Sequence, residues 1–285
     1  MAAGVLLLGA MATGTARAAG CDRACLQNMM TRYLDAMVAH APSQLPLAAN
    51  VRFTEDSREL KLGDGLWKTV TRKGGFRQDY IDVRRQIAAA HVQLFEGGTQ
   101  VLYSVVLRVA EGKIGGIETL VFRVTPDVKF KPDRLDKPLP GMNDPVPAGK
   151  GMSRAEMVRV ALTYMEGLRV GGFIKANTPF APEAYRMENG VRTAGEGCTT
   201  STNCVTRTQH WPAATHMQAS VAVVDEEAGI VLLWMNFGGA EAAQGPDKAL
   251  VTFEAFKIWG GSIHAINAFL CYLPKKTERG WPTAE

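Results

Sequence analysis

The sequence predicts an α+β protein built from two tandem copies of one fold. Three landmarks occur twice in the same order: an amphipathic helix, a strand that carries a glutamate, and a closing β-hairpin. A helix followed by a run of long strands is typical of α+β domains, in which helices pack on one face of a sheet. Self-similarity in this order indicates a duplicated structural unit.

The two predicted helices share one apolar pattern. Tyr33 falls within the stripe of the first helix, and Tyr164 lies 131 positions later within the second. Apolar residues at helical spacing place one face of each helix against a core, and a buried Tyr hydroxyl needs a hydrogen-bond partner. A capping box, Ser153-Arg154-Ala155-Glu156, opens the second helix. The stripes are Leu26, Met29, Met30, Tyr33, Leu34 and Met37 in the first helix and Met157, Val160, Ala161, Tyr164, Met165 and Leu168 in the second.

The other two landmarks show where the copies differ in length. Glu55 and Glu188 lie 133 positions apart in matching strand sequences, whereas Ile114 and Ile263 of the Gly-rich closing hairpins lie 149 positions apart. The growing offset predicts an insertion of about 16 residues in the second copy, near 193–212. Because the first copy lacks this insertion, the fold itself does not need it.

These landmarks divide the chain into segments. The first copy is predicted over residues 21–125 and the second over 152–275, with a Pro-rich linker at 126–151 and a C-terminal tail at 276–285. Proline at this density excludes regular structure, so we expect the linker to extend over the surface. Strands are predicted at 87–95, 99–109 and 117–125 in the first copy and at 216–224, 230–237, 249–258 and 263–273 in the second.

Residues 1–20 have the features of a secretory signal peptide. An apolar run at 5–12 precedes the small-x-small pattern Ala16-Arg17-Ala18, which is typical of a cleavage site. The usual basic segment before that run is missing, so the true start of the chain is left open, and a lipoprotein linked through Cys21 is the alternative. No other run is long and apolar enough to span a bilayer. We therefore expect a periplasmic or secreted protein with no membrane partner after signal removal. The net charge of +4 without a basic block predicts no nucleic-acid partner.

Five cysteines in an exported chain indicate disulfides. Cys21 and Cys25 lie at the start of the first helix, and Cys198 and Cys204 close a short Thr/Ser-rich loop inside the insertion, so each close pair is a predicted disulfide. Cys271 is left over on the last strand as a buried thiol, with a reactive nucleophile as the alternative. Neither close pair has zinc-ligand spacing, so no metal site is predicted.

Each copy resembles a nuclear transport factor two-like (SnoaL-like) domain, and the whole chain resembles exported two-copy proteins of uncharacterised function. The resemblance rests on the helix with its inward Tyr, on the strands ending Phe53-Thr54-Glu55-Asp56 and Met187-Glu188-Asn189-Gly190, and on the closing hairpins. It implies two tandem cone-shaped α+β barrels, each with N-terminal helices packed on a curved antiparallel sheet around an apolar cavity. It also implies chemistry without metal or organic cofactor, in which a carboxylate or His acts as base and Tyr, Asn or a neutral acid stabilises an oxyanion.

The second copy is richer in candidate catalytic residues, which are His210, Glu188 and His264. His210 ends the insertion that the fold does not need, and a His side chain exchanges protons near neutral pH. Glu188 precedes an Asn-Gly dipeptide, which is also a hairpin turn signal with a solvated carboxylate beside it. His264 shares a strand face with Ile266 by the period of two, so it leans toward the cavity mouth if Ile266 points into the core.

Six further residues form the predicted substrate-binding set. The alternative for Tyr164 is core packing with a local hydrogen bond, for Trp211 that it only fills a surface loop closed by the disulfide, and for Asn189 a hairpin turn. The set is Tyr164, Tyr185, Asn189, Trp211, His216 and Trp234.

We therefore predict an exported, cofactor-independent lyase or isomerase that applies acid–base chemistry to a small hydrophobic, aromatic or lignin-derived compound. The aromatic- and Met-rich stripes suit such a ligand, and the link to lignin compounds is by analogy with fold relatives. The alternative is a non-catalytic ligand-binding or scaffold protein. Domains of the family that the copies resemble often pair through their sheets. We therefore expect either that the two copies pair with each other within the chain or that the protein forms a homo-oligomer. Convergence of His210 and Glu188 in one cavity favours the enzyme.

Overall fold

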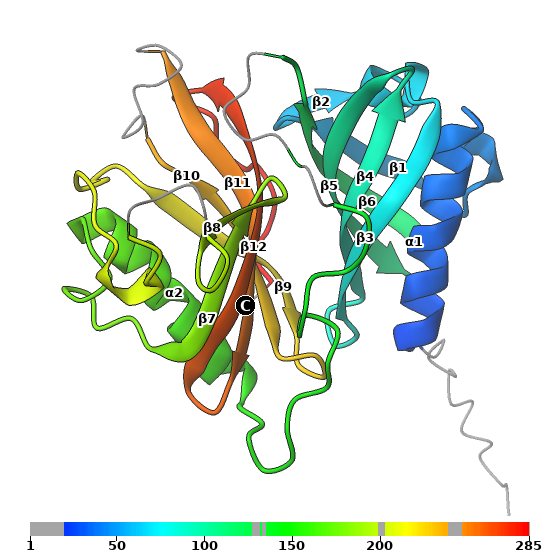
Figure 1. Ribbon diagram of the computed structural model, residues 1–285. Coiled ribbons are helices and arrows are strands. Elements are labelled where there is room, and N and C mark those ends of the chain that lie inside the picture. The colour runs from blue at the N-terminus through cyan, green and yellow to red at the C-terminus, as the bar shows by residue number, and fades with distance from the viewer. Residues whose placement is uncertain (1–19, 127–131, 133–134, 199–202, 239–246, 285) are drawn as a thin grey trace, which may run out of the picture.

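The structure, a computed structural model, describes residues 20–126, 132, 135–198, 203–238 and 247–284. In this part of the chain two six-stranded sheets lie face to face, and each carries one long α-helix on its outer side (Figure 1). The predicted signal peptide falls outside the described residues, apart from Gly20. Among the described residues, no helix is long and apolar enough to cross a membrane.

The first half of the chain forms a sheet in the order β2-β1-β6-β5-β4-β3. Neighbouring strands are antiparallel, except that β1 runs parallel to β6. The elements are α1 (Arg23–Val38), η1 (Pro42–Gln44), β1 (Leu47–Glu55), β2 (Arg58–Leu60), η2 (Gly65–Lys68), β3 (Arg72–Asp82), β4 (Ile87–Glu96), β5 (Thr99–Ala110) and β6 (Lys113–Arg123).

The second half repeats this arrangement in the order β8-β7-β12-β11-β10-β9, with β7 parallel to β12. Its helix α2 begins with the predicted capping box, whose two reciprocal hydrogen bonds are both present. The elements are α2 (Arg154–Val170), β7 (Phe180–Glu188), β8 (Val191–Ala194), η3 (Thr206–Thr208), β9 (Gln218–Asp225), β10 (Ile230–Asn236), β11 (Lys248–Trp259) and β12 (Ser262–Pro274).

The architecture is consistent with two tandem domains of the predicted α+β class, with three corrections. Both sheets are mixed, whereas the sequence predicts antiparallel ones, because the first strand of each copy inserts beside the last. The edge strand β3 is not predicted from the sequence, because it carries few apolar residues and the pair Gly74-Gly75. Each copy has one long helix among the described residues, where the resemblance implies several.

The duplication extends to single hydrogen bonds. Asp56 and Asn189 follow the two glutamates, and both have positive φ, 53° and 47°. The side-chain oxygen of Asp56 accepts from the backbone N–H of Val121, and that of Asn189 accepts from Leu270, each at 2.9 Å. In each copy this short polar side chain stands in for a backbone carbonyl at the end of the parallel ladder.

Each helix covers the face of its sheet that points away from the other sheet. Under α1, the Tyr33 hydroxyl lies 2.8 Å from the Tyr103 hydroxyl and accepts a hydrogen bond from the Trp67 indole at 3.1 Å. All three side chains are fully buried. The predicted partner of the Tyr33 hydroxyl is therefore present, inside a closed aromatic core.

The two remaining sheet faces form a common core between the copies. Phe269 stacks on His91, with ring centroids 4.4 Å apart, and lies 5.8 Å from Phe76. The Asn267 amide donates to the Tyr80 hydroxyl at 3.1 Å and lies 3.0 Å from Nδ1 of His91. The copies thus pair through their sheets within one chain, and a larger homo-oligomer stays a prediction.

Two buried ion pairs cross the boundary between the copies and are related by the repeat. Arg23 of α1 donates two hydrogen bonds to Asp225 at the end of β9, at 2.8 and 2.9 Å. Arg154 of α2 donates to Asp82 at the end of β3, at 2.6 Å. Each aspartate also accepts a backbone N–H from the other copy, and both carboxylates are buried. Each helix is therefore tied to the sheet of the other copy.

The C-terminal tail crosses the same boundary. Arg279 donates two hydrogen bonds to Glu118 of β6, at 2.7 and 2.9 Å. The Trp281 ring lies near the guanidinium groups of Arg52 and Arg108, at 4.3 and 4.4 Å from its centroid. The described part of the tail is thus clamped on the first copy by ion-pair and cation–π contacts.

The crossed ion pairs predict a stability effect. Replacing Asp82 by Asn leaves the mostly buried Arg154 charge with only the more distant Glu226, at 3.6 Å, so the free energy of unfolding should fall by up to about 3–5 kcal/mol. Urea unfolding measures this loss, and Asp225→Asn should behave alike. Glu59→Gln is the control, because it removes an exposed pair with Arg52 that contributes less than about 1 kcal/mol. Similar small effects for D82N and E59Q would contradict the assignment.

His91 predicts a loss of stability in acid. Burial lowers its pKa from 6.5 to about 3. Below pH 6.5 the unfolded chain therefore binds a proton that the folded chain does not, and stability falls as the pH drops from 6.5 toward 3. In urea titrations at pH 7 and pH 5, His91→Gln should be less stable than wild type at pH 7 but should lose less between the two. Equal losses would show that His91 does not carry this pH dependence.

Candidate functional site

Four polar side chains gather between α2 and the sheet face that it covers: Tyr164, Arg186, Glu188 and Glu254, which we call the α2 cluster. Tyr164 comes from the apolar stripe of α2, Arg186 and Glu188 from β7, and Glu254 from the middle of β11. Because successive residues of a strand point to opposite faces, Arg186 and Glu188 both face α2. The Glu188 side chain is 22% exposed and Glu254 is 2% exposed, so the cluster runs from the surface into the core.

Arg186 is the centre of the cluster. Its Nε lies 3.2 Å from a Glu188 carboxylate oxygen and donates to the Thr193 hydroxyl at 3.0 Å. Its Nη1 donates to the Tyr164 hydroxyl at 3.3 Å. A guanidinium stays charged in a protein, so the interior of the second copy holds a fixed positive charge.

The surroundings shift the proton affinities of the cluster. Burial, followed by the negative charge of Glu188, raises the pKa of Glu254 to about 8, against the opposing effects of Arg186 and Tyr164. Burial also raises the pKa of Tyr164 well above its ordinary value. For Arg186, burial lowers the pKa, but Glu188, Tyr164 and Glu254 together raise it further. At neutral pH Glu254 is therefore mostly protonated beside a permanent cation.

Aromatic rings surround the cluster. Tyr164 lies 4.7 Å from Phe173 and 4.9 Å from Phe256, measured between ring centroids. Phe173 in turn lies 5.0 Å from Phe180 and 5.0 Å from Trp211. In such surroundings of low polarity, hydrogen bonds and charge interactions are stronger than in water.

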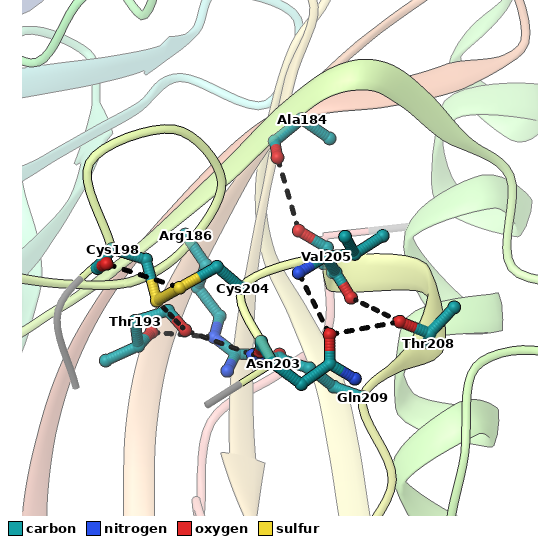
Figure 2. The surroundings of a disulfide bond; sticks show 10 residues. Ala184, Arg186, Thr193, Cys198, Asn203, Cys204, Val205, Thr208 and Gln209 are labelled. Atoms are coloured by element: carbon teal, nitrogen blue, oxygen red, sulfur yellow. Dashed lines mark hydrogen bonds between the residues drawn. A yellow bond between two sulfur atoms is a disulfide. The ribbon is translucent and has the colours of Figure 1, made fainter. Parts of the chain in front are cut away.

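The described part of the insertion predicted near 193–212 covers one side of the cluster. Its disulfide joins Cys198 to Cys204, and Figure 2 shows the Arg186 side chain passing beside this disulfide toward Thr193 and Gln209. The Gln209 amide donates to the Thr193 carbonyl at 3.1 Å. The segment found in only one copy thus contacts the buried arginine found in only that copy.

Both predicted disulfides are confirmed, since Cys21 also joins Cys25. Cys271 is a buried free thiol, which agrees with the first of the two interpretations of the sequence. Burial raises the pKa of this thiol well above its ordinary value. Two intramolecular disulfides are compatible with an extracellular or periplasmic location.

Three buried oxygen atoms near the cluster have no hydrogen-bond partner among the described residues. They are Oε1 of Glu254, Oε1 of Gln209 and Oγ1 of Thr252. Thr252 and Glu254 are two residues apart on β11 and therefore share the face toward α2. Buried polar atoms are normally paired, so these three retain capacity to bind a polar group.

The first copy provides an internal control for this cluster. Phe53 holds the place in the β1–β6 ladder that Arg186 holds in the β7–β12 ladder. Val105 holds the place in the β5–β6 ladder that Glu254 holds in the β11–β12 ladder. The same fold is therefore built in the first copy without the buried arginine and without the buried acid.

Among the predicted catalytic residues, Glu188 belongs to the α2 cluster and His210 does not. His210 is exposed, and no hydrogen bond joins it to Glu188 within the described parts of the chain. Its neighbours Gln209 and Trp211 are the more buried residues of this segment. In this extended segment, the residues on either side of His210 turn inward and the imidazole turns outward.

His264 also lies away from the cluster. It stacks on Trp259, with ring centroids 3.4 Å apart, and its Nδ1 lies 2.6 Å from the exposed Glu183. Its Nε2 contacts the Trp259 carbonyl at 3.1 Å. Both ring nitrogens are thus engaged beside the closing hairpin, away from the face under α2.

The predicted substrate-binding residues divide between the cluster and other places. Tyr164 lies in the cluster, and the Trp211 ring centroid lies 6.0 Å from the Arg186 guanidinium carbon. Tyr185 and Trp234 lie on the opposite sheet face, where the Tyr185 hydroxyl donates to the Pro140 carbonyl of the linker at 2.5 Å. The two others stand apart: Asn189 closes the end of β7, and His216 is exposed.

Sequence reasoning missed Arg186 and Glu254. Charged residues in a strand usually face solvent, so the sequence alone does not indicate Arg186 or Glu254 as candidate site residues. The alignment of the repeats contains the missing signal, because it sets Arg186 against Phe53 in otherwise matching strands. A charge opposite a core Phe in a duplicated fold indicates a site.

Among the described residues, no group of three or more His, Cys, Asp or Glu side chains is arranged to hold a metal ion.

Comparison with known proteins gives a family match and two structural neighbours. A family described as "Domain of unknown function (DUF8021)" matches residues 150–270, and no curated protein matches. A de novo designed protein with a curved β-sheet is 19% identical, with a TM-score of 0.31, over 38% of this chain and 92% of its own. A protein from Kribbella flavida described as a "putative ketosteroid isomerase" is 19% identical, with a TM-score of 0.28, over 40% of this chain and 94% of its own.

Glu254 predicts a loss of stability in base. Its pKa rises from 4.5 to about 8 on folding, so the folded chain holds the proton more firmly. This contribution is complete below pH 4.5 and is lost as the pH rises through 8. In urea titrations at pH 6 and pH 9, wild type should lose about 3 kcal/mol more than Glu254→Gln. Glu59→Gln, which alters an exposed carboxylate, should lose as much as wild type. A loss in E254Q equal to that of wild type would contradict the shifted pKa.

Proposed function

We propose that the α2 cluster is the active site of an exported, cofactor-independent lyase or isomerase that applies acid–base chemistry to a small hydrophobic, aromatic compound. The observation that carries this proposal is the difference between the copies. Burying a charge costs free energy unless other groups compensate it. Phe53 and Val105 show that the fold does not require such groups, so Arg186 and Glu254 are explained by a role in chemistry or binding.

The cluster contains each kind of group that such a reaction needs. Glu188, nearer the surface, is the proposed base that removes a proton from a carbon next to a carbonyl. Arg186 and Tyr164 then stabilise the negative charge that develops on the carbonyl oxygen. Glu254, which is mostly protonated at neutral pH, returns a proton to a second carbon in an isomerase or to the leaving group in a lyase.

The aromatic rings packed around the cluster support an aromatic substrate. Phe173, Phe180, Phe256 and Trp211 surround the polar centre with flat apolar side chains. Ligand pockets commonly combine such side chains with a few convergent polar groups that orient the ligand. We infer a small planar compound that carries one carbonyl or hydroxyl group toward Arg186.

The alternative function is binding of the same class of ligand without turnover. One observation favours it: His210 is exposed and both ring nitrogens of His264 are engaged, so neither predicted histidine joins the cluster. Chemistry then depends on the carboxyl groups alone for proton transfer.

Ligand screening followed by product analysis tests the proposal. Thermal shifts of the purified protein against phenolic monomers, aromatic dimers and enolisable aromatic ketones should identify a stabilising ligand. Wild type should convert it, with a limb of the pH–rate profile near 8, and Glu254→Gln should lose at least about 100-fold in kcat. The matched control is Glu55→Gln in the first copy, which should retain the rate of wild type.

Three outcomes count against the enzyme. Binding without turnover by wild type would favour the ligand-binding alternative. Full turnover by E254Q would show that the reaction occurs elsewhere. Equal losses in E254Q and E55Q would indicate a general structural effect.

A further inference from the structure

A groove of about 680 Å³ lies on the outer side of α2, at the boundary between the copies. Its floor is apolar: Val158 and Leu162 lie one helical turn apart and are partly exposed, with Ala155 in the turn before them. This helix face is separate from the face that carries Tyr164, so the groove is distinct from the α2 cluster.

Arginines form the rim of the groove. Arg84, Arg154 and Arg159 line it, against one acidic residue, Glu226. Arg154 is neutralised by the buried Asp82 behind it, at 2.6 Å. Glu226 lies 3.9 Å from Arg84 and 3.6 Å from Arg154. The rim therefore keeps one excess positive charge, which the exposed Arg159 carries without an acidic partner in the rim. The first backbone N–H groups of α2 are capped by Ser153 and Glu156, so an anion here would be recognised by the side chains rather than by the helix terminus.

The first copy again shows what the fold requires. Its helix has Gln27, Asn28 and Thr31 at the positions of Val158, Arg159 and Leu162, all 131 positions earlier. The equivalent groove beside α1 is lined by charged and polar side chains, among them Arg23, Gln27, Arg77 and Asp79. There the Thr31 hydroxyl accepts a hydrogen bond from Arg77 at 2.8 Å. A polar helix face is thus compatible with the fold at this boundary, and the second copy has exchanged it for an apolar one.

We propose that the α2 groove binds a single-chain amphiphilic carboxylate. The alkyl chain lies along Val158 and Leu162, which removes their partly exposed apolar surface from water. The carboxylate pairs with Arg159 and Arg84, whose guanidinium groups match it in charge and shape. The inference is independent of the chemistry proposed for the α2 cluster.

Titration calorimetry with decanoate, below its micelle-forming concentration, tests this site. The double variant Val158→Gln/Leu162→Thr installs the residues of the first copy and should bind at least about tenfold more weakly than wild type. Arg159→Asn should also weaken binding several-fold, and this exposed substitution leaves the core untouched. Decyltrimethylammonium, with the same chain and the opposite charge, should not bind. Ile174→Thr is the control, because it removes an apolar side chain that is 60% exposed elsewhere, and it should bind as wild type does.

Three results would overturn the proposal. The first is the absence of decanoate binding by wild type. The second is unchanged affinity in both the double variant and R159N. The third is sedimentation with phosphatidylglycerol vesicles that is lost in the double variant while free decanoate fails to bind, which would assign the groove to a membrane surface.

Discussion

The structure depends on the crossed ion pairs between Arg23 and Asp225 and between Arg154 and Asp82. Each arginine stands at the start of the helix of one copy and reaches a buried aspartate at the end of a strand of the other. Both helices are thereby fixed at the boundary, and the two sheets are held face to face around one core (Figure 1). Because one face of each sheet is used for this pairing, the face under the helix is where each copy can hold a site of its own.

The two copies have used that face differently. In the first, the polar groups of Tyr33, Tyr103 and Trp67 form hydrogen bonds with one another inside an aromatic core. In the second, Arg186 and Glu254 stand where the first copy has Phe53 and Val105, and the described part of the disulfide-closed insertion lies against Arg186 (Figure 2). The outer face of α2 differs in the opposite sense, because it is apolar where the corresponding face of α1 is polar. In a duplicated fold, a feature that is present in only one copy is not required for folding.

Much of the fold follows from the sequence because its signals are local. The 3.6-residue stripes predict both helices, period-two runs predict most long strands, and cysteine spacing predicts both disulfides. The parallel pairing of β1 with β6 joins strands about 65 residues apart, and no local pattern specifies it. The same holds for the crossed ion pairs, whose partners come from different copies.

The site is less predictable for a related reason. Tyr164 and Glu188 were accessible through the repeat, but the orientation of His210 depends on which residues of the insertion turn inward, and Gln209 and Trp211 do so. Arg186 and Glu254 resemble surface residues until the sheet encloses them. Their burial gives the cluster its proton affinities, and this property arises only from the tertiary structure.

The most direct test of the account is NMR titration of the Glu254 carboxyl carbon in protein labelled with ¹³C-glutamate, assigned by the signal missing from E254Q. The account predicts a titration midpoint near 8, well separated from those of exposed glutamates. A midpoint near the ordinary value of 4.5 would show that Glu254 is ionised at neutral pH, and would contradict a proton donor held beside Arg186.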